Sequence, residues 1–119
     1  MQFFLTAAIV SLAGLCAATA SPNSNAVCGM GGIYLDTRLR LWEIHCKSSV
    51  YGSDISNSTP TKQDTMKACL NFHSGKAGTK AVQWNSDSKD CWPIDHRPAQ
   101  WVDVDGKGVP QDANVAIKL

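Results

Sequence analysis

The sequence predicts an α+β domain in which one helix packs on a small, mainly antiparallel sheet joined by two disulfides. Three observations predict this class. Apolar residues recur at helical spacing in residues 66–73, an extended alternation follows in residues 79–85, and four cysteines come after an apolar leader. A chain this small builds one modest core, so cross-links contribute a large share of its stability.

The helix is predicted by four residues at positions i, i+3, i+4 and i+7, which share one helix face. These residues are Met66, Cys69, Leu70 and His73. We expect Thr61 to be the N-cap and Asp64 to lie in the first turn, where a negative charge suits the helix dipole. Ser74-Gly75 and Gly78 predict the end of the helix and a chain reversal.

Two strands are predicted after the helix. In residues 79–85, one side carries Lys80, Val82 and Trp84, and the other carries Thr79, Ala81 and Gln83. The turn residues 85–88 follow, and then extended structure resumes at 91–94. Pro93 cannot donate to a ladder, so this strand is expected to lie near a sheet edge or to end there.

The other segments give weaker signals. Residues 33–46 predict a strand or a hairpin with a turn at Asp36-Thr37, and its inward face carries Trp42, Ile44 and Cys46. We expect residues 48–61 to form a polar loop and residues 95–114 to form a long irregular stretch. The first of these loops contains Asn57-Ser58-Thr59, a sequon that predicts an exposed glycosylation site at Asn57.

The N-terminus predicts secretion. Residues 3–18 are almost wholly apolar, and Ala18-Thr19-Ala20 is a small-x-small cleavage site, so residues 1–20 are expected to be a signal peptide. The alternative is a membrane anchor, but about 16 apolar residues are short for a span of roughly 20. Residues 21–119 then form a single domain, with no membrane contact after cleavage and an expected monomeric state.

Composition limits the partners. The chain has 11 Lys and Arg against 10 Asp and Glu, with no basic cluster, which argues against nucleic acid as the main partner. Cys16 leaves with the signal peptide, and an even number of cysteines in a small secreted domain predicts two disulfides. The four remaining cysteines are Cys28, Cys46, Cys69 and Cys91, which allow three pairings.

Residues 39–119 resemble the PAN/apple domain, especially its small secreted fungal members. The resemblance rests on a helix that carries Cys69, a following hairpin that carries Cys91, and the upstream segments 41–46 and 51–55. Residues 115–119 are similar to the closing strand of the family. The resemblance implies a Cys69–Cys91 disulfide, which leaves Cys28–Cys46. Closing the 23-residue loop from 69 to 91 contributes about 3 kcal/mol in the chain-entropy model.

One disulfide of the family is missing at both of its ends. His73 stands where the family has its second helix cysteine, and Thr79 stands where the strand partner of that cysteine belongs. Because both cysteines are absent together, no orphan thiol remains. The resemblance therefore implies a PAN-like fold that lacks one bridge, with His73 filling the vacated space.

No metal or other cofactor is expected. A calcium loop starting at Asp103 would need an oxygen ligand at its fifth position and Glu at its twelfth, but Lys107 and Asn114 stand there. Cys69 and Cys91 with His73 and His96 would suit zinc, yet a secreted chain favours a disulfide between the thiols.

A small secreted hydrolase of the nuclease or glycosidase class is the alternative to a binding module. Small secreted ribonucleases use Glu, Arg and His in that chain order. Glu43 is the only Glu, and no His follows Arg97, so the order is incomplete. No motif singles out a carboxylate pair for glycoside hydrolysis or a Ser-His-Asp triad.

Tryptophan content is the positive indication of binding. Trp42 and Trp84 are expected in the core, whereas Trp92 and Trp101 are candidates for a ligand patch with His96 and Arg97. The resemblance implies a secreted, non-catalytic module that binds an extracellular polysaccharide or a protein. A stand-alone protein of this kind is a candidate fungal effector or cell-wall-associated factor.

Overall fold

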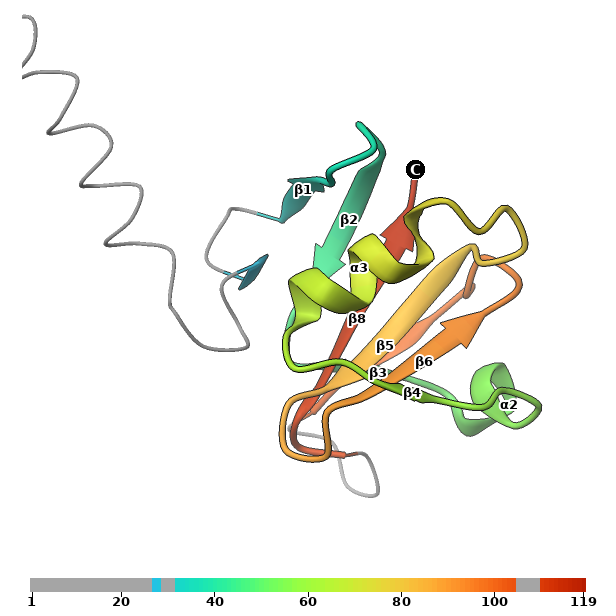
Figure 1. Ribbon diagram of the computed structural model, residues 1–119. Coiled ribbons are helices and arrows are strands. Elements are labelled where there is room, and N and C mark those ends of the chain that lie inside the picture. Colours follow the sequence, from blue (N-terminus) through green and yellow to red (C-terminus); the bar gives the residue numbers. More distant parts are fainter. Residues whose placement is uncertain (1–26, 29–31, 105–109) are drawn as a thin grey trace, which may run out of the picture.

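The computed structural model describes residues 27–28, 32–104 and 110–119 (Figure 1). The predicted signal peptide, the segment 21–26 and part of the Asp103–Gly108 turn lie outside these residues. Within the described ranges, no helix has both the length and the apolar character needed to cross a membrane.

The protein is α+β with antiparallel sheets. A six-stranded sheet has the order β1-β2-β8-β5-β6-β4, and a two-stranded sheet pairs β3 with β7. The strands are β1 (Ile33–Leu35), β2 (Leu41–His45), β3 (Ser48–Val50), β4 (Thr61–Lys62), β5 (Ala81–Asn85), β6 (Asp90–Ile94), β7 (Trp101–Asp103) and β8 (Ala113–Lys118). Within the described residues the helices are α2 (Gly52–Ile55) and α3 (Met66–Ser74), so a second, short helix accompanies the predicted one.

α3 lies across one face of the large sheet (Figure 1), and its predicted face is buried. Its four residues at helical spacing are all buried, and the three apolar ones share a core cluster with Trp42 and Trp84, which are fully buried as expected. Each indole N–H has an acceptor: Trp84 Nε1 donates to the Gln63 carbonyl at 2.8 Å, and Trp42 Nε1 donates to Asp36 Oδ2 at 2.8 Å. The core therefore buries large aromatic rings without leaving their donors unpaired.

The predicted helix start is wrong. Thr65, not Thr61, is the N-cap, because its side-chain oxygen accepts from the Ala68 N–H at 3.0 Å. Thr61 instead lies in β4, where it pairs with Cys91 of β6. Asp64 precedes the helix and does not stand in its first turn. Threonine occurs at both positions, and only the strand pairing of residues 61–62 decides which of them caps. The predicted end is confirmed, since Gly75 is the C-cap.

The opposite face of the sheet is covered by a second layer. Val50, Ala81, Ile94, Val115 and Ile117 form a core there, with Ile55 and Trp101 packed against it. Residues 48–61 and 95–114 are therefore not simply loops as expected. The first contains β3 and α2, and the second contains β7 and the start of β8.

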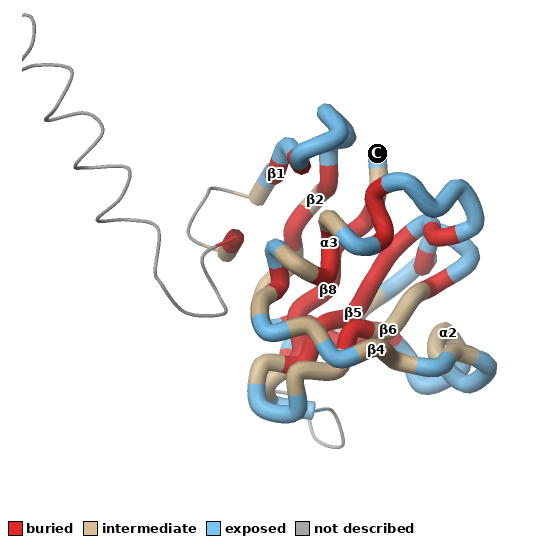
Figure 2. Tube along the Cα trace, viewed as in Figure 1, coloured by how far each residue is buried: buried red, intermediate tan, exposed pale blue. Residues whose placement is uncertain are grey.

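Because both faces of the large sheet are covered, its central strands are buried along almost their whole length. β5 is buried at every residue and β8 at all but Lys118, as the red segments of Figure 2 show. Gln83 is the polar residue that joins the layers: its Oε1 accepts from the Val50 N–H at 2.9 Å and from Ser49 Oγ at 3.1 Å. A buried amide with both contacts made is favourable, and one left unpaired would be costly.

Pro93 was expected near a sheet edge or a strand end because it has no N–H, and it lies near the end of β6. β4 is only two residues long and pairs with Asp90 and Cys91, so it does not reach Pro93. On that exposed side, the Pro93 carbonyl accepts from Ser58 Oγ at 2.6 Å. β6 ends one residue later, at Ile94.

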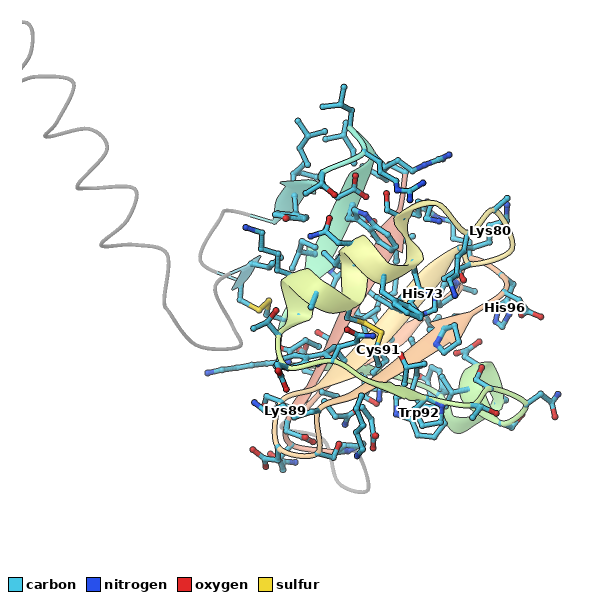
Figure 3. All side chains as sticks on the ribbon, viewed as in Figure 1. His73, Lys80, Lys89, Cys91, Trp92 and His96 are labelled. Atoms are coloured by element: carbon cyan, nitrogen blue, oxygen red, sulfur yellow. A yellow bond between two sulfur atoms is a disulfide. The ribbon has the colours of Figure 1, made fainter. Side chains whose placement is uncertain are left out.

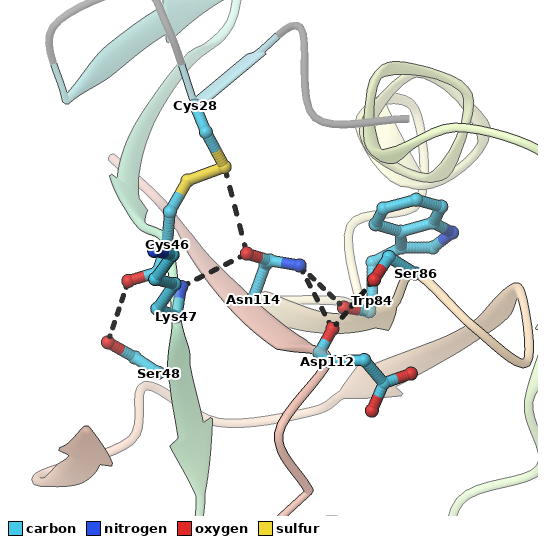
Figure 4. The surroundings of a disulfide bond; sticks show 8 residues. All are labelled: Cys28, Cys46, Lys47, Ser48, Trp84, Ser86, Asp112 and Asn114. Carbon is cyan, nitrogen blue, oxygen red and sulfur yellow. Dashed lines mark hydrogen bonds between the residues drawn. A yellow bond between two sulfur atoms is a disulfide. The ribbon is translucent and has the colours of Figure 1, made fainter. Parts of the chain in front are cut away.

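Both implied disulfides, Cys28–Cys46 and Cys69–Cys91, are present. Cys69–Cys91 joins α3 to β6 in the core. Around Cys28–Cys46, Asn114 is the organising residue (Figure 4): its Oδ1 accepts from the Lys47 N–H at 3.0 Å, and its Nδ2 donates to the Asp112 carbonyl at 3.1 Å. The Cys28 sulfur lies 3.7 Å from the same Oδ1 as a contact, because a disulfide sulfur carries no proton.

Two charged side chains each make several hydrogen bonds to backbone groups. Asp36, buried in the β1–β2 turn, accepts from the N–H groups of Arg38 at 2.8 Å and Arg40 at 3.0 Å. From β8, Lys118 Nζ donates to the carbonyls of His73 at 2.9 Å and Lys76 at 3.1 Å. Those carbonyls lie at the C-terminal end of α3, where a cation is favourable.

Candidate functional site

A polar cleft of about 450 Å³ lies between the segment 53–59 on one side and the segments 78–79 and 93–96 on the other. Apart from Gly78 and Pro93, its lining is polar: Ser53, Asp54, Asn57, Ser58, Thr59, Thr79, Asp95 and His96. The lining thus combines hydroxyl groups, an amide, two carboxylates and an imidazole. The volume lies within the usual range of ligand pockets, about 300–1,000 Å³.

The fold builds this cleft from parts that are far apart in sequence. α2 stands against β6, and the loop after it is tied down where Ser58 Oγ meets the Pro93 carbonyl. Thr79 enters from the turn before β5. Its hydroxyl lies 3.2 Å from His73 Nδ1. The cleft therefore depends on the second layer, which sequence periodicity did not reveal.

His96 joins the two sides of the cleft. Its Nε2 lies 2.6 Å from Asp54 Oδ1, on α2, and its Nδ1 lies 2.9 Å from Asp95 Oδ1. Hydrogen bonds to Asp95 and then to Asp54 raise the pKa of His96 above its usual value, and the His96 imidazole lowers the pKa of Asp95. The pair of contacts favours the doubly protonated imidazolium, because both ring nitrogens then donate.

His73 lies behind the cleft and is buried. Burial, with the nearby charges of Lys76 and Lys118, lowers the pKa of His73 to about 4, so the ring is neutral at pH 7. The resemblance places His73 and Thr79 at the two ends of a missing family disulfide, and in the structure these side chains are in contact at 3.2 Å. His73 packs against the core and does not line the cleft.

A second polar cluster lies on β2 beneath β7. Glu43 Oε2 is 3.5 Å from His45 Nε2 and 3.5 Å from Arg97 Nη2. The Trp101 ring covers His45, with ring centroids 4.1 Å apart. Glu43 Oε2 and His45 Nε2 are both buried atoms. The cluster therefore holds the β6–β7 connection against β2 and does not present these two atoms to solvent.

The four residues expected to form a ligand patch do not all lie at one site. His96 alone lines the cleft, and Arg97 and Trp101 join the Glu43 cluster. Trp92, labelled with His96 in Figure 3, is half-buried on β6. The strand register runs from Trp92 through Gln83 and Val115 to His45. Three strand spacings of about 4.8 Å therefore separate Trp92 from the position that Trp101 covers.

The sequence reasoning missed Asp54, Asp95 and the hydroxyl groups of the cleft. In the sequence, Asp54 stands out only as part of the segment 51–55, and its partner His96 lies 42 residues further on. Asn57, expected as a glycosylation site, is exposed and lies at the cleft. The sequon follows the end of α2 and gives no local signal of a cleft, because the opposite wall comes partly from the end of β6.

Cys69 and Cys91 are joined to each other, so neither offers a thiolate to a metal. Among the described residues, no group of three or more His, Cys, Asp or Glu side chains is arranged to hold a metal ion. No protein-family model, curated protein or solved structure matches the chain. The functional argument therefore rests on the geometry of the cleft.

Proposed function

We propose that this protein is a secreted, non-catalytic binding module of PAN/apple-like fold whose polar cleft binds a carbohydrate. The observation that carries the proposal is the lining of the cleft, in which carboxylates, an amide and hydroxyl groups surround a space of about 450 Å³. A sugar presents several hydroxyl groups, each a donor and an acceptor. Carboxylates accept from them, and Ser and Thr side chains both donate and accept.

Secretion and the family resemblance have separate support. Two disulfides are typical of an oxidising compartment, and the apolar N-terminal segment suits a signal peptide. The contact between His73 and Thr79 is what a PAN-like fold lacking one bridge would produce. On this proposal the protein acts outside the cell, as an effector or a cell-wall-associated factor.

The test is retention on insoluble chitin, cellulose, β-glucan and xylan. The full chain is produced through a secretory host and purified in oxidised form. The blocking variant is Gly78→Leu, because a Cβ at Gly78 meets nothing within 4 Å and the longer side chain fills the cleft. The control is Ala77→Leu, which adds a similar side chain at an exposed neighbour that does not line the cleft.

We expect retention on one polysaccharide, lost in Gly78→Leu and kept in Ala77→Leu. Retention that both variants keep would place the sugar site elsewhere. Trp92→Ala and Trp101→Ala would then test the tryptophan patch. No retention on any polysaccharide would reject a carbohydrate ligand and favour a protein partner, to be sought by affinity capture from extracellular fluid.

We also propose that Asn57 carries an N-linked glycan at the rim of the cleft. Asn57 is exposed, and the sequon hydroxyl belongs to Thr59. A glycan at this position would compete with an external ligand for the cleft. Asn57→Gln should therefore lower the mass of the secreted protein by one glycan and strengthen polysaccharide retention, and an unchanged mass would contradict the modification.

The alternative is a small secreted hydrolase, and the Glu43 cluster is the observation that favours it. A carboxylate, an imidazole and a guanidinium are a set that phosphodiester or glycoside hydrolysis can use. Against it, Glu43 Oε2 and His45 Nε2 are buried and turned toward each other. Hydrolysis of RNA or of a bound polysaccharide that is lost in Glu43→Gln would overturn the non-catalytic proposal.

A further inference from the structure

His96 holds two carboxylates at once, and this arrangement depends on its protonation state. Asp54 Oδ1 is 2.6 Å from Nε2, and Asp95 Oδ1 is 2.9 Å from Nδ1. A neutral imidazole has one N–H and one lone pair, so it can donate to only one of these carboxylates. The other ring nitrogen would then place a lone pair against a carboxylate oxygen. Only the imidazolium satisfies both contacts.

The contact to Asp54 matters for the cleft because α2 has few other attachments. α2 is four residues long, has no side-chain N-cap and contains no buried residue. Besides His96, the described contacts that hold this segment are the partial burial of Ile55 and the Ser58–Pro93 hydrogen bond. A helix this short is not stable on its own, so its position depends on these few contacts.

The charged groups around His96 come from two segments. Asp54 stands on α2, and Asp95 precedes His96 at the end of β6. Asp54 is only 16 % exposed, whereas Asp95 is 90 % exposed and stays well solvated without the histidine. Arg97, the next residue, turns away to Glu43 at 3.5 Å. The two carboxylates of Asp95 and Asp54 therefore determine how strongly the protonated form of His96 is favoured.

We propose that the cleft is a pH-gated binding site in which the His96 imidazolium fastens α2 to the end of β6. This inference rests on the proposed function of the cleft. Below the pKa of His96, both carboxylate contacts are made and the wall formed by α2 is ordered. As the pH rises through that pKa, the charge-assisted contact to Asp54 gives way to a neutral hydrogen bond at most, and the wall loosens. Ligand binding is thus stronger in acid.

The first test of the gate needs no ligand. Hydrogen exchange of the Asp54 and Ser58 amides reports on α2 and its loop, since these amides donate to the Tyr51 and Ile55 carbonyls at 2.9 and 3.0 Å. Exchange is measured from pH 5 to 9 and corrected for its intrinsic pH dependence, and NMR follows the His96 titration. We expect protection to fall about fivefold through the His96 midpoint, because charge-assisted hydrogen bonds are about twice as strong as neutral ones.

Three variants distinguish the effect of His96 protonation on α2 from a general effect of pH. His96→Lys keeps a cation at every pH used and should keep α2 protected. His96→Gln is neutral throughout and should show low protection without a transition. The matched control is His45→Gln, because His45 also faces a carboxylate, 3.5 Å away in Glu43, but lies outside the cleft. It should behave as the wild type does.

Constant protection of α2 while His96 titrates would overturn the gate, as would loss of the transition in His45→Gln. Retention on the bound polysaccharide is then measured over the same pH range, with an expected fall of about fivefold that His96→Lys abolishes. Equal retention on both sides of the His96 midpoint would overturn the gate and leave the binding function standing. Absence of retention at every pH would instead reject a carbohydrate ligand, and the exchange experiment would still decide whether the His96 imidazolium holds α2 in place.

Discussion

Asp36→Asn is expected to destabilise the protein at pH 7 but much less at pH 2. The Asp36 carboxylate is 3 % exposed and accepts from two backbone N–H groups and from the Trp42 indole at 2.8 Å. In the variant, one carbonyl oxygen can still serve the backbone, but the amide NH₂ faces the indole N–H. A charged hydrogen bond is lost and a buried donor is left unpaired, at a cost of about 3 kcal/mol.

The pH dependence follows from the pKa of Asp36. Burial alone would raise this pKa, but the Ser74 side chain, the Trp42 indole and the N–H groups of Arg40 and Arg38 outweigh burial and hold it at about 2. The ordinary value is 3.8, so the difference of 1.8 corresponds to about 2.4 kcal/mol at about 1.36 kcal/mol for each unit. A lowered carboxyl pKa stabilises the fold above pH 4, and that stabilisation is lost as the pH falls through 2.

The assay is urea unfolding of the oxidised protein at pH 7, 4 and 2, followed by tryptophan fluorescence. We expect the difference between wild type and Asp36→Asn to shrink from about 3 kcal/mol at pH 7 to about 1 kcal/mol at pH 2. The control is Asp64→Asn, which replaces an exposed carboxylate with no hydrogen bond or ion pair among the described residues. A difference that stays constant with pH would refute the role of the buried carboxylate.

Three further predictions concern the core. Replacing Cys69 and Cys91 together by Ser should lower the free energy of unfolding by about 3 kcal/mol, measured in urea; a loss below 1 kcal/mol would contradict a large contribution from this disulfide. Gln83→Leu should leave the Val50 N–H unpaired and cost about 2 kcal/mol, with faster hydrogen exchange at Val50; unchanged exchange would show that Gln83 does not hold the second layer. His73 has a pKa near 4 against an ordinary 6.5, so its neutral form stabilises the fold above pH 6.5 and this is lost as the pH falls through 4. His73→Leu should therefore remove a loss of about 3 kcal/mol between pH 7 and pH 4 that the wild type shows; equal acid sensitivity in both proteins would exclude it.

Local patterns predicted the first layer of the fold. The helical spacing of Met66, Cys69, Leu70 and His73 named a face that is buried, because periodicity records which side of an element meets the core. The same reasoning failed at the helix start. Thr61 and Thr65 are equivalent as caps in sequence, and the pairing of Thr61 with Cys91 removes it from the helix.

The second layer could not be predicted by the same means. β3 and β7 are three residues long, too short to show an alternation, and they exist because each pairs with the other and because Gln83 accepts from Val50. Alternation in residues 79–85 predicted β5, but alternation is typical of a half-buried strand and gave no indication that β5 is buried on both faces. For these reasons, the segments expected to be loops contain β3, α2 and β7, which the sequence did not predict.

From the sequence alone we could predict the α+β class, the helix face, the buried Trp42 and Trp84 and, through a resemblance, the two disulfide pairs. The class, the helix face and the buried tryptophans follow from local spacing or from residue type, whereas the disulfide pairs follow only from the resemblance. The cleft, and the placement of His96 in it without Trp92, Trp101 and Arg97, could be seen only in the folded protein. The physical reason is distance along the chain: Asp54 and His96 are 42 residues apart, and the packing of α2 against β6 brings them within 2.6 Å.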